Sequence, residues 1–341
     1  MPLRLLEVVI PGHLEETVGE ILESHKAVST WRLETSREDD TVYHAVLRAE
    51  GTEALMDAIE EGCPTCPELR MVLLPVEAAV PHPEPEEPEE KPEEEQESRI
   101  ATLTGRRISR EEIYADAREG AESSISFFAL MGLSAVVASV GLLRDNVAVI
   151  IGAMVIAPLF GPNMGLAVGT TLGDRDLISH GLRTLAAGIV LTVGVSLVVG
   201  LLRPVDPSIP AIATRTAVSY SDVVLALAAG AAGTFAFMAG QARALIGVMV
   251  AVALVPPLSA FGLLVGSGNM GPATGAVLQA AVNVICINLA GVAAFLIQGL
   301  RPRSWWEAEK AKSATRRAAL IWTVLLALLV VILAFQTGRG A

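Results

Sequence analysis

Long runs without charged residues dominate the chain after residue 122 and predict membrane-spanning helices. The longest run, Ala244–Leu300, contains no Asp, Glu, Lys or Arg. A spanning helix needs about 20 apolar residues, so this run is long enough for two helices on either side of the turn-forming stretch Gly266–Pro272. Shorter uncharged runs lie at Ser123–Leu143, Asn146–Gly173, Thr184–Leu202, Val223–Ala242 and Ala318–Gly338. The pattern predicts seven spans and, because the first 30 residues are mixed and charged, no signal peptide.

Residues 1–80 have a different pattern, which predicts a small α+β domain. Strand-like segments are separated by two amphipathic helices, at His13–Ser24 and Thr52–Glu61, and the order of elements is βαββαβ. The strand-like segments are Arg4–Ile10, Val28–Leu33, Thr41–Ala49 and Leu69–Val76. This order is that of a ferredoxin-like sandwich. We therefore expect an N-terminal ferredoxin-like domain attached to an all-α polytopic membrane domain.

The composition supports this division. Charged residues make up only 18% of the chain, below the roughly 25% of soluble domains. Much of the net charge of −12 comes from residues 84–97, which hold nine Glu and one Lys. Such a Pro/Glu-rich stretch is too polar to pack, so we predict an extended linker over 81–98. An amphipathic lead-in helix at 99–121 would connect this linker to the membrane domain at 122–338. We expect no nucleic-acid partner.

Two segments of the membrane domain repeat one another at an offset of 95 residues. Residues 151–162 (IGAMVIAPLFGP) and 246–257 (IGVMVAVALVPP) are identical at six of twelve positions, and both contain prolines. Proline interrupts the helical hydrogen-bond ladder, and the freed backbone groups must be buried in protein or line a wet cavity. We therefore expect two broken helices whose ends contact a ligand. The alternative is a pair of kinks that serve packing only.

The distribution of Lys and Arg predicts the orientation. Fourteen lie on the side of the N-terminal domain and four on the other side. The positive-inside rule therefore places the N-terminal domain in the cytoplasm and the C-terminus outside the cell membrane. We expect the spans to lie in the cell (inner) membrane. The two copies lie in spans 2 and 5, three crossings apart. This spacing predicts an inverted repeat of 122–203 and 215–300 with an extra span at 318–338. A missed span between the copies would make the repeats parallel instead.

The polar residues of the spans are mostly amides and hydroxyls, which predicts a site for a small ion or polar solute between spans 2 and 5. A mid-membrane carboxylate or histidine, typical of proton coupling, is not evident. Asn283 and Asn288 point about 140° apart on a helix, so we expect one of them to face inward. The candidate site residues are Asn146, Gly152, Met154, Pro158, Gly161, Pro162, Asn163, Gly247, Met249, Pro256, Pro257, Ser259, Asn283 and Asn288. Candidate coupling or gating groups at the span ends are Glu122, Arg215 and Asp222.

Cys63 and Cys66 form a C-x-x-C pair, which in other proteins is a redox dithiol or half of a metal site. No His lies at a finger-like spacing from the pair, so two ordinary thiols in a loop are the favoured interpretation. We expect no cofactor and no metal. No nucleophile–base set is evident in the membrane domain, which argues against an enzyme.

Three blocks of the chain resemble the hallmark blocks of domain-of-unknown-function family 389, whose members are polytopic membrane proteins of bacteria and archaea. The blocks are VAVIIGAMVIAPLFGPNMGLAVG (147–169), RTAVSYSDVVLALAAGAAGTFAF (215–237) and LIGVMVAVALVPPLSAFGLLVGSG (245–268), in that order. The resemblance covers about residues 105–300 and supplies no substrate. It implies family-pattern positions at Gly152, Met154, Pro158, Gly161, Pro162, Arg215, Gly230, Gly247, Pro256 and Pro257.

These observations together favour a transporter that works by alternating access and carries a cytosolic regulatory or oligomerising domain. We expect the lipid bilayer and further copies of the chain as its partners. A membrane-anchored sensor or scaffold is the first alternative, and it would pack spans 2 and 5 solidly. An ion channel is the second, and it would need a continuous polar path.

Overall fold

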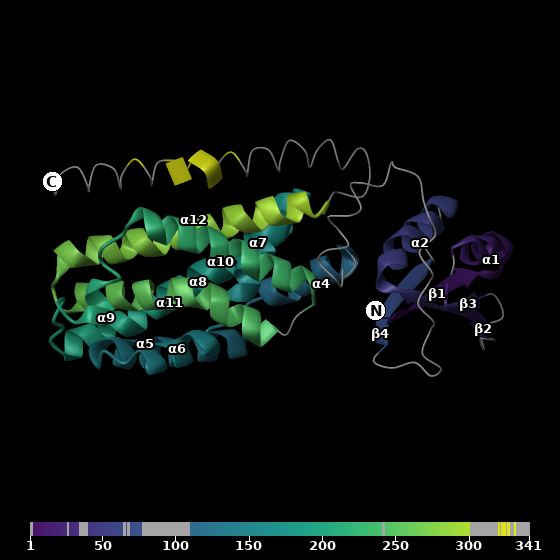
Figure 1. Ribbon diagram of the computed structural model, residues 1–341. Helices are drawn as coiled ribbons and strands as arrows, with labels where there is room; N and C mark the ends of the chain where they lie inside the picture. The colour runs from purple at the N-terminus through teal and green to yellow at the C-terminus, as the bar shows by residue number, and fades with distance from the viewer. Residues whose placement is uncertain are drawn as a thin grey trace. The chain divides into compact units, whose positions relative to one another are not determined.

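The computed structural model describes two compact units, one containing the N-terminal domain and the other the helices from Ile113 onward (Figure 1). The described residues are 3–25, 27–33, 40–63, 66, 69–76, 110–240, 243–300, 320, 322–324, 326–327 and 331; at 40, 49–50, 53 and 243–253 this description covers the backbone only. The predicted linker 81–98 and the first part of the lead-in helix lie outside the described residues.

The N-terminal unit has the predicted order of elements. It consists of β1 (Leu3–Pro11), the 3-10 turn η1 (Gly12–Leu14), α1 (Glu15–Ser24), β2 (Ser29–Leu33), β3 (Asp40–Arg48), α2 (Ala49–Gly62) and β4 (Arg70–Val76). The four strands form one sheet in the order β2-β3-β1-β4, and every neighbouring pair is antiparallel. This strand order and the βαββαβ sequence are those expected of a ferredoxin-like sandwich.

One face of this sheet carries the core of the unit. Leu6, Val8 and Ile10 alternate along β1 and are fully buried, together with Leu55 and Ile59 of α2. The other face carries apolar side chains that remain accessible, because both helices contribute to the core on the first face.

The second unit is helical and apolar. Its elements are α4 (Arg110–Ala121), α5 (Ile125–Leu143), α6 (Val147–Ile156), α7 (Phe160–Leu172), α8 (Arg175–Leu202), α9 (Pro210–Ala213), α10 (Tyr220–Met238), α11 (Arg243–Gly266) and α12 (Met270–Ile297). Helices α5, α8, α10 and α12 are long and apolar enough to cross a membrane, and the bent pair α6–α7 makes five if it is one span. The described residues are therefore compatible with a multi-pass membrane protein.

The count of seven predicted spans is not reached by the described residues. In α11 they supply the shorter apolar segment Leu254–Gly266. Of the predicted seventh span, Trp322 and Leu326 pack against a buried cluster that includes Ala226 of α10 and Cys286 of α12. The remainder of that span lies outside the described residues.

Local side-chain chemistry explains where these helices begin and end. Ser124, Asn146 and Asp174 lie at the N-caps of α5, α6 and α8, and each side chain accepts a hydrogen bond from a backbone amide of the first turn. Such caps satisfy amides that have no partner within the helix. At the end of α7, Gly173 adopts φ +73°, a left-handed conformation that terminates helices and favours glycine.

The helix bounds of the first half recur 95 residues later. Helices α5 and α10 each have 19 residues, and α8 and α12 each have 28, with both ends shifted by 95 in each pair. The left-handed turn recurs as well, because Gly268, at φ +82°, occupies the position that matches Gly173. The correspondence at an offset of 95 residues thus includes the bounds of two further helix pairs and not only the two proline-containing segments.

Close helix contacts give the direction of each segment. Gly181 of α8 lies against Pro162 and Gly169 of α7 against Ile178, so α7 and α8 are antiparallel. Helices α8 and α11 are parallel, because Gly262 lies against Val193 and Gly266 against Leu201. It follows that α7 and α11, which contain the two copies of the proline segment, run in opposite directions. Figure 1 shows α11 between α5 and α12 in the helical unit.

Candidate functional site

The first proline segment is broken as predicted. The last turn of α6 ends at Ala157, whose ψ of 118° is extended, and the axes of α6 and α7 differ by 55°. The cause is Pro158, because a proline disfavours the helical conformation of the residue before it. Pro162 contributes little to the break, since it lies in the first turn of α7, where an amide N–H has no helical acceptor anyway.

The prediction of a broken helix in the second copy is wrong. Helix α11 runs continuously from Arg243 to Gly266 with Pro256 and Pro257 inside it. The two copies differ in the one proline that matters. Pro257 matches Pro162, whereas the position that matches Pro158 is Ala253. The two prolines have no N–H to donate to the helix, but the helix is not interrupted at the pair.

A groove of about 350 Å³ opens beside the break between α6 and α7. Its volume is within the range of small-molecule sites, about 300–1,000 Å³. The polar lining comes from three carboxylates and two hydroxyls at the end of α4 and the start of α5. The complete lining is Asp116, Glu119, Gly120, Glu122, Ser124, Ser126, Phe127, Leu130, Val155, Ile156, Ala157, Pro158, Phe160, Gly161, Met164 and Phe237.

The groove depends on an unusually close approach of α4 to α7. Gly120 and Gly161 face each other so closely that a Cβ at residue 161 would overlap the carbonyl of Gly120. One turn further along α7, a Cβ on Gly165 would come within 2.7 Å of the Cβ of Ala121. Glycine at these positions brings the acidic end of α4 next to the helix break.

Just past the break, two amides meet inside the helical unit. Nδ2 of Asn288 on α12 donates to Oδ1 of Asn163 on α7 over 2.9 Å, and Nδ2 of Asn163 donates to the carbonyl of Leu159 over 2.7 Å. Both residues are fully buried. Within the described part of the chain, Oδ1 of Asn288 is buried without a hydrogen-bond partner. An unsatisfied buried acceptor is costly. A ligand or water that donated a hydrogen bond to this oxygen would therefore be stabilised.

The other predicted site residues are distributed more widely. Asn146 caps α6 at the end of that helix opposite the break, and Asn283 is buried elsewhere on α12. Ser259 is buried, and its hydroxyl has no partner among the described residues. Gly152 has open space around it and Met154 is buried. The side chain at Met249 and the surroundings of Gly247 lie outside the described residues.

The three candidate gating groups have different surroundings. Glu122 lines the groove. Arg215 donates to the carbonyl of Ala211, and its burial lowers the pKa of the guanidinium, an effect opposed by nearby Asp145. Asp222 accepts hydrogen bonds from the backbone and hydroxyl of Ser219. Only Glu122 is therefore close to the helix break.

Sequence reasoning missed Asp116, Glu119 and Phe237 as lining residues of the groove. A signal for the carboxylates existed, because residues 116, 119 and 122 recur at a spacing of three and share one side of a helix. No comparable signal pointed to Phe237, since its place depends on how α10 packs.

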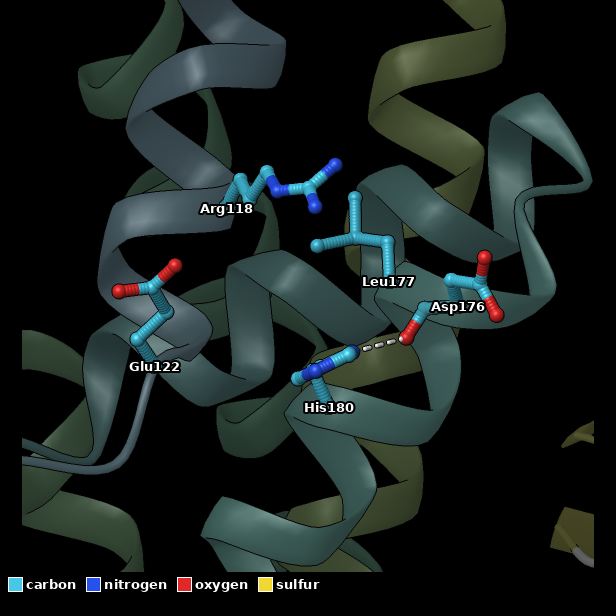
Figure 2. Close-up of a pocket in the computed structure, with 5 residues that line it drawn as sticks. All are labelled: Arg118, Glu122, Asp176, Leu177 and His180. Atoms are coloured by element: carbon cyan, nitrogen blue, oxygen red, sulfur yellow. Dashed lines mark hydrogen bonds between the residues drawn. The ribbon is translucent and has the colours of Figure 1, made fainter.

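A smaller pocket of about 30 Å³ lies between α4 and α8 (Figure 2), lined by Arg118, Glu122, Asp176, Leu177 and His180. The volume is enough for a water molecule or two. In Figure 2 the side chain of Arg118 comes from α4 and that of Glu122 from the residue just after α4, while His180 reaches the backbone carbonyl of Asp176 over 2.7 Å. The mixture of charges is typical of a polar contact between two helices, and we call this contact between α4 and α8 the seam.

The seam is held by a hydrogen bond of 2.6 Å from the hydroxyl of Tyr114 to Asp174. Burial by itself would raise the pKa of the Asp174 carboxyl. The hydrogen bonds from Tyr114 and from the amides of Leu177 and Asp176 outweigh burial, so the pKa is lowered. Arg118 donates to the same hydroxyl over 3.3 Å. Asp174 is therefore an ionised anchor for α4 at neutral pH.

The C-x-x-C pair consists of two free thiols, a buried Cys63 and a half-buried Cys66. Burial, followed by the charge of the Cys66 thiolate, raises the pKa of Cys63. A raised pKa keeps the thiol protonated and weakly nucleophilic. In the described part of the chain, no three His, Cys, Asp or Glu side chains are grouped so that they could hold a metal ion.

Comparison with known proteins places these features in context. The model of the family described as "Domain of unknown function (DUF389)" matches residues 154–289. An uncharacterized protein of Methanocaldococcus jannaschii is 32% identical over 334 residues, which cover 98% of this chain and 99% of that protein. No solved structure matches the chain. The matched family segment contains Pro158, Asn163 and Asn288, and thus both the break and the amide pair.

Proposed function

The chain belongs to the DUF389 family, and from this premise we propose that it is a membrane transporter that moves a small ion or polar solute by alternating access. The observation that carries the proposal is the groove of about 350 Å³ in whose wall an apolar helix is broken. Broken helices at the repeat interface are the usual place for a transported solute, because their backbone groups are free to contact it.

An inverted repeat would supply the two conformations that alternating access requires. The matched helix bounds and the opposite directions of α7 and α11 support such a repeat. Equivalent contacts support it further. Gly262 of α11 lies against Ser196 of α8, and at the positions 95 residues away Ala167 of α7 lies against Gly291 of α12. A pseudo-two-fold axis that exchanges the halves would interchange these two contacts.

Hydrogen bonds inside the first helix of each half agree with this symmetry. The hydroxyl of Ser139 donates to the carbonyl of Ala135 over 2.8 Å, and that of Thr234 donates to the carbonyl of Gly230 over 2.8 Å. Both pairs differ by 95 in number. Two halves with nearly the same internal packing can exchange roles at a small cost in free energy, which is the physical basis of rocking between two states.

If the groove beside α5 is one vestibule of the transporter, the symmetry predicts a second vestibule at the opposite end of the unit. Ser126 and Leu130, which line the groove, match Ser221 and Leu225 of α10, and the residues are identical at both positions. When the groove beside α5 closes, we expect the equivalent space beside α10 to open. Ser126 and Ser221 are thus reporters for the two states.

Reciprocal accessibility of these two positions tests the proposal without a known substrate. Ser126→Cys and Ser221→Cys are combined in a background without Cys63, Cys66 and Cys286, in proteoliposomes. Labelling position 126 first with a bulky maleimide should slow the labelling of position 221 several-fold, because a wedge in one vestibule holds the other closed. Ser208→Cys, at an exposed position in the loop between α8 and α9, is the control that should stay fully reactive.

The alternatives give different results in the same experiment. A channel would leave both positions accessible at once, so blocking one would not slow the other. A scaffold would show fixed reactivity at both positions. Either outcome would contradict alternating access.

We further propose that the N-terminal unit faces the cytoplasm and joins two copies of the chain. Support for self-association comes from the open face of its sheet. Trp31 and Leu33 of β2 are each 41% exposed, and Val72 and Leu74 of β4 are each 44% exposed. Between them, His44 reaches Glu7 over 2.8 Å, so the central charge is already paired. An apolar face of this kind commonly marks a protein–protein contact.

A further inference from the structure

We infer that residues 203–219, the segment around α9, form the gate at the end of the helical unit opposite the groove, and that Asp145 and Arg215 hold this gate closed. The inference rests on the proposed transport function and adds the part that moves. It follows from the position of the segment, from its correspondence with α4 and from the contacts that bury it.

Helices α4 and α9 lie at opposite ends of the helical unit (Figure 1). The hydroxyl of Tyr114 binds Asp174, so α4 lies beside the start of α8. The segment around α9 begins where α8 ends, at Arg203. Helix α8 has 28 residues, which corresponds to a length of about 42 Å, close to the thickness of a bilayer with its headgroups. An element at each end of α8 can therefore close one side of a transporter.

The segment around α9 has the same place in the second half as α4 has in the first. Ser124 directly precedes α5, and Ser219, 95 residues later, directly precedes α10. The residues that hold the two segments match as well. Asp174 at the N-cap of α8 holds α4, and Asn269 at the N-cap of α12 donates from Nδ2 to the carbonyl of Val205 over 3.1 Å. We therefore treat the two segments as equivalent elements at opposite ends.

The two segments differ at the residue beside the repeated proline segment. In the first half this residue is Gly120, which allows the close approach of Gly161 and lines the groove. In the second half the matching residue is Arg215, whose long side chain is half-buried. The arginine therefore takes up space that the glycine leaves free at the other end.

Contacts at α9 hold the segment against the helices. Ala211 is only 5% exposed, and Ile212 is fully buried. Oδ1 of Asp145, in the turn between α5 and α6, accepts a hydrogen bond from the amide of Ala211 over 2.8 Å. Nη1 of Arg215 donates to the carbonyl of Ala211 over 2.9 Å. Asp145 and Arg215 thus hold the two backbone groups of one residue, and their opposite charges attract each other.

The backbone at Asp145 indicates that this carboxylate is needed where it is. Asp145 adopts φ +51°, a left-handed conformation that is unfavourable for residues with a side chain. The matching position in the second half is Gly240, at φ +62°, where glycine has no such cost. Strain of this kind persists where the residue has a further role. At Asp145 that role is to hold α9.

Two single-cysteine reporters in proteoliposomes test the gate, in the cysteine-free background described above. Ala211→Cys reports on the gate and Ser126→Cys on the groove. Asp145→Gly should speed the alkylation of position 211 about tenfold, because a hydrogen bond to a charged group is lost. It should also slow the alkylation of position 126 several-fold, because a shift toward the state that is open at α9 closes the groove. Glycine already occupies the matching turn at Gly240, so the variant should keep the backbone of the turn.

A second variant and two controls separate gating from loosening. Arg215→Gln should have the same two effects, since it removes the other partner of Ala211. Arg144→Gln, an exposed position next to Asp145, and Asp206→Asn, whose carboxylate binds Ser208 within its own loop, should have neither. Faster alkylation of position 211 with an unchanged rate at position 126 would identify a local anchor. Faster alkylation at both positions would identify a general loosening. Either outcome, or an unchanged rate at position 211, would overturn the inference.

Failure of the gate and failure of the transport proposal are distinguishable. Reciprocal labelling of positions 126 and 221 that persists while Asp145→Gly and Arg215→Gln change nothing would reject only the gate. Absence of reciprocal labelling in the otherwise wild-type protein would reject alternating access, and the gate with it.

Discussion

Asn288 donates from Nδ2 to Oδ1 of Asn163 over 2.9 Å, and this bond joins α12 to α7 inside the helical unit. The crossing of α8 and α11, which the proposed inverted repeat would make equivalent, has Val193 and Leu258 at the positions 95 residues away. One of two equivalent crossings is thus polar and the other apolar. Because the apolar version already packs in this protein, the amides are not needed for packing alone. Their presence points to a role in function.

The first prediction follows from that comparison. Replacing both amides with the residues of the other crossing, Asn163→Leu with Asn288→Val, should leave the free energy of unfolding within about 1 kcal/mol of wild type. The reason is that neither buried amide is left behind without the other, while the carbonyls of Leu159 and Val284 lose only a side-chain donor. The same double variant should lose reciprocal labelling of positions 126 and 221. Unfolding in detergent and labelling in proteoliposomes are the two measurements.

The single variant Asn163→Leu is the control for this prediction. It leaves Nδ2 of Asn288 without its Asn163 acceptor, beside an Oδ1 that already has no partner among the described residues. We expect it to be less stable than the double variant by about 1–2 kcal/mol. A double variant that is less stable than either single variant would show that the amides serve packing after all.

The second prediction concerns the close contact of α4 and α7. Gly161→Ala would place a methyl group on the carbonyl of Gly120, and backbone cannot move aside as a side chain can. We expect a loss of about 1–3 kcal/mol in stability and a changed groove, visible as altered alkylation of Ser126→Cys. The matched control is Gly152→Ala on α6, where a Cβ meets nothing within 4 Å. Equal effects of the two substitutions would contradict the close approach.

The sequence predicted the fold where local chemistry decides and missed it where packing decides. The break at Pro158 was predictable, because a proline restricts the residue before it. The continuity of α11 through Pro256 and Pro257 was not predicted, because the expectation relied on the presence of prolines in both copies and not on Ala253, which stands where the first copy has Pro158. The sequence likewise suggested that only one of Asn283 and Asn288 would face inward, but only the structure identifies Asn288 as the partner of Asn163.

The acidic part of the site was overlooked for a related reason. The lead-in helix was predicted and Glu122 was a candidate gating group, but Asp116 and Glu119, at a spacing of three residues on one face, were not considered as site residues. The glycine contact at Gly120 and Gly161 brings that face to the helix break. Tertiary approach of two helices is not encoded in the periodicity of either one, so the groove could only be found in three dimensions.

The third prediction tests the open sheet face of the N-terminal unit. Leu74→Lys places a charge on an apolar face, where burial in an interface between two copies would be costly. We expect the full-length protein in detergent to change from a dimer or larger oligomer to a smaller species, measured by light scattering after gel filtration. Ala54→Lys, an exposed position on α2, should leave the mass unchanged. A wild-type monomer, or an unchanged mass for Leu74→Lys, would reject self-association through this face.

The last prediction concerns acid stability at the α4–α8 seam. The pKa of the Asp174 carboxyl is lowered from its ordinary value of 3.8, since hydrogen bonds to the carboxylate outweigh its burial. A lowered pKa contributes stability above the unfolded value, and this contribution is lost as the pH falls below 3.8 toward the folded value. Tyr114→Phe removes one of those hydrogen bonds, so the pKa of Asp174 should rise. We expect the variant to be less stable by about 1 kcal/mol at pH 7 and the difference from wild type to shrink as the pH falls below 4. Thermal unfolding between pH 7 and pH 3 measures this, with Tyr220→Phe as the control, because Tyr220 is 51% exposed. A difference that grows toward low pH would mean that Tyr114 stabilises the seam through packing and not through the Asp174 carboxylate.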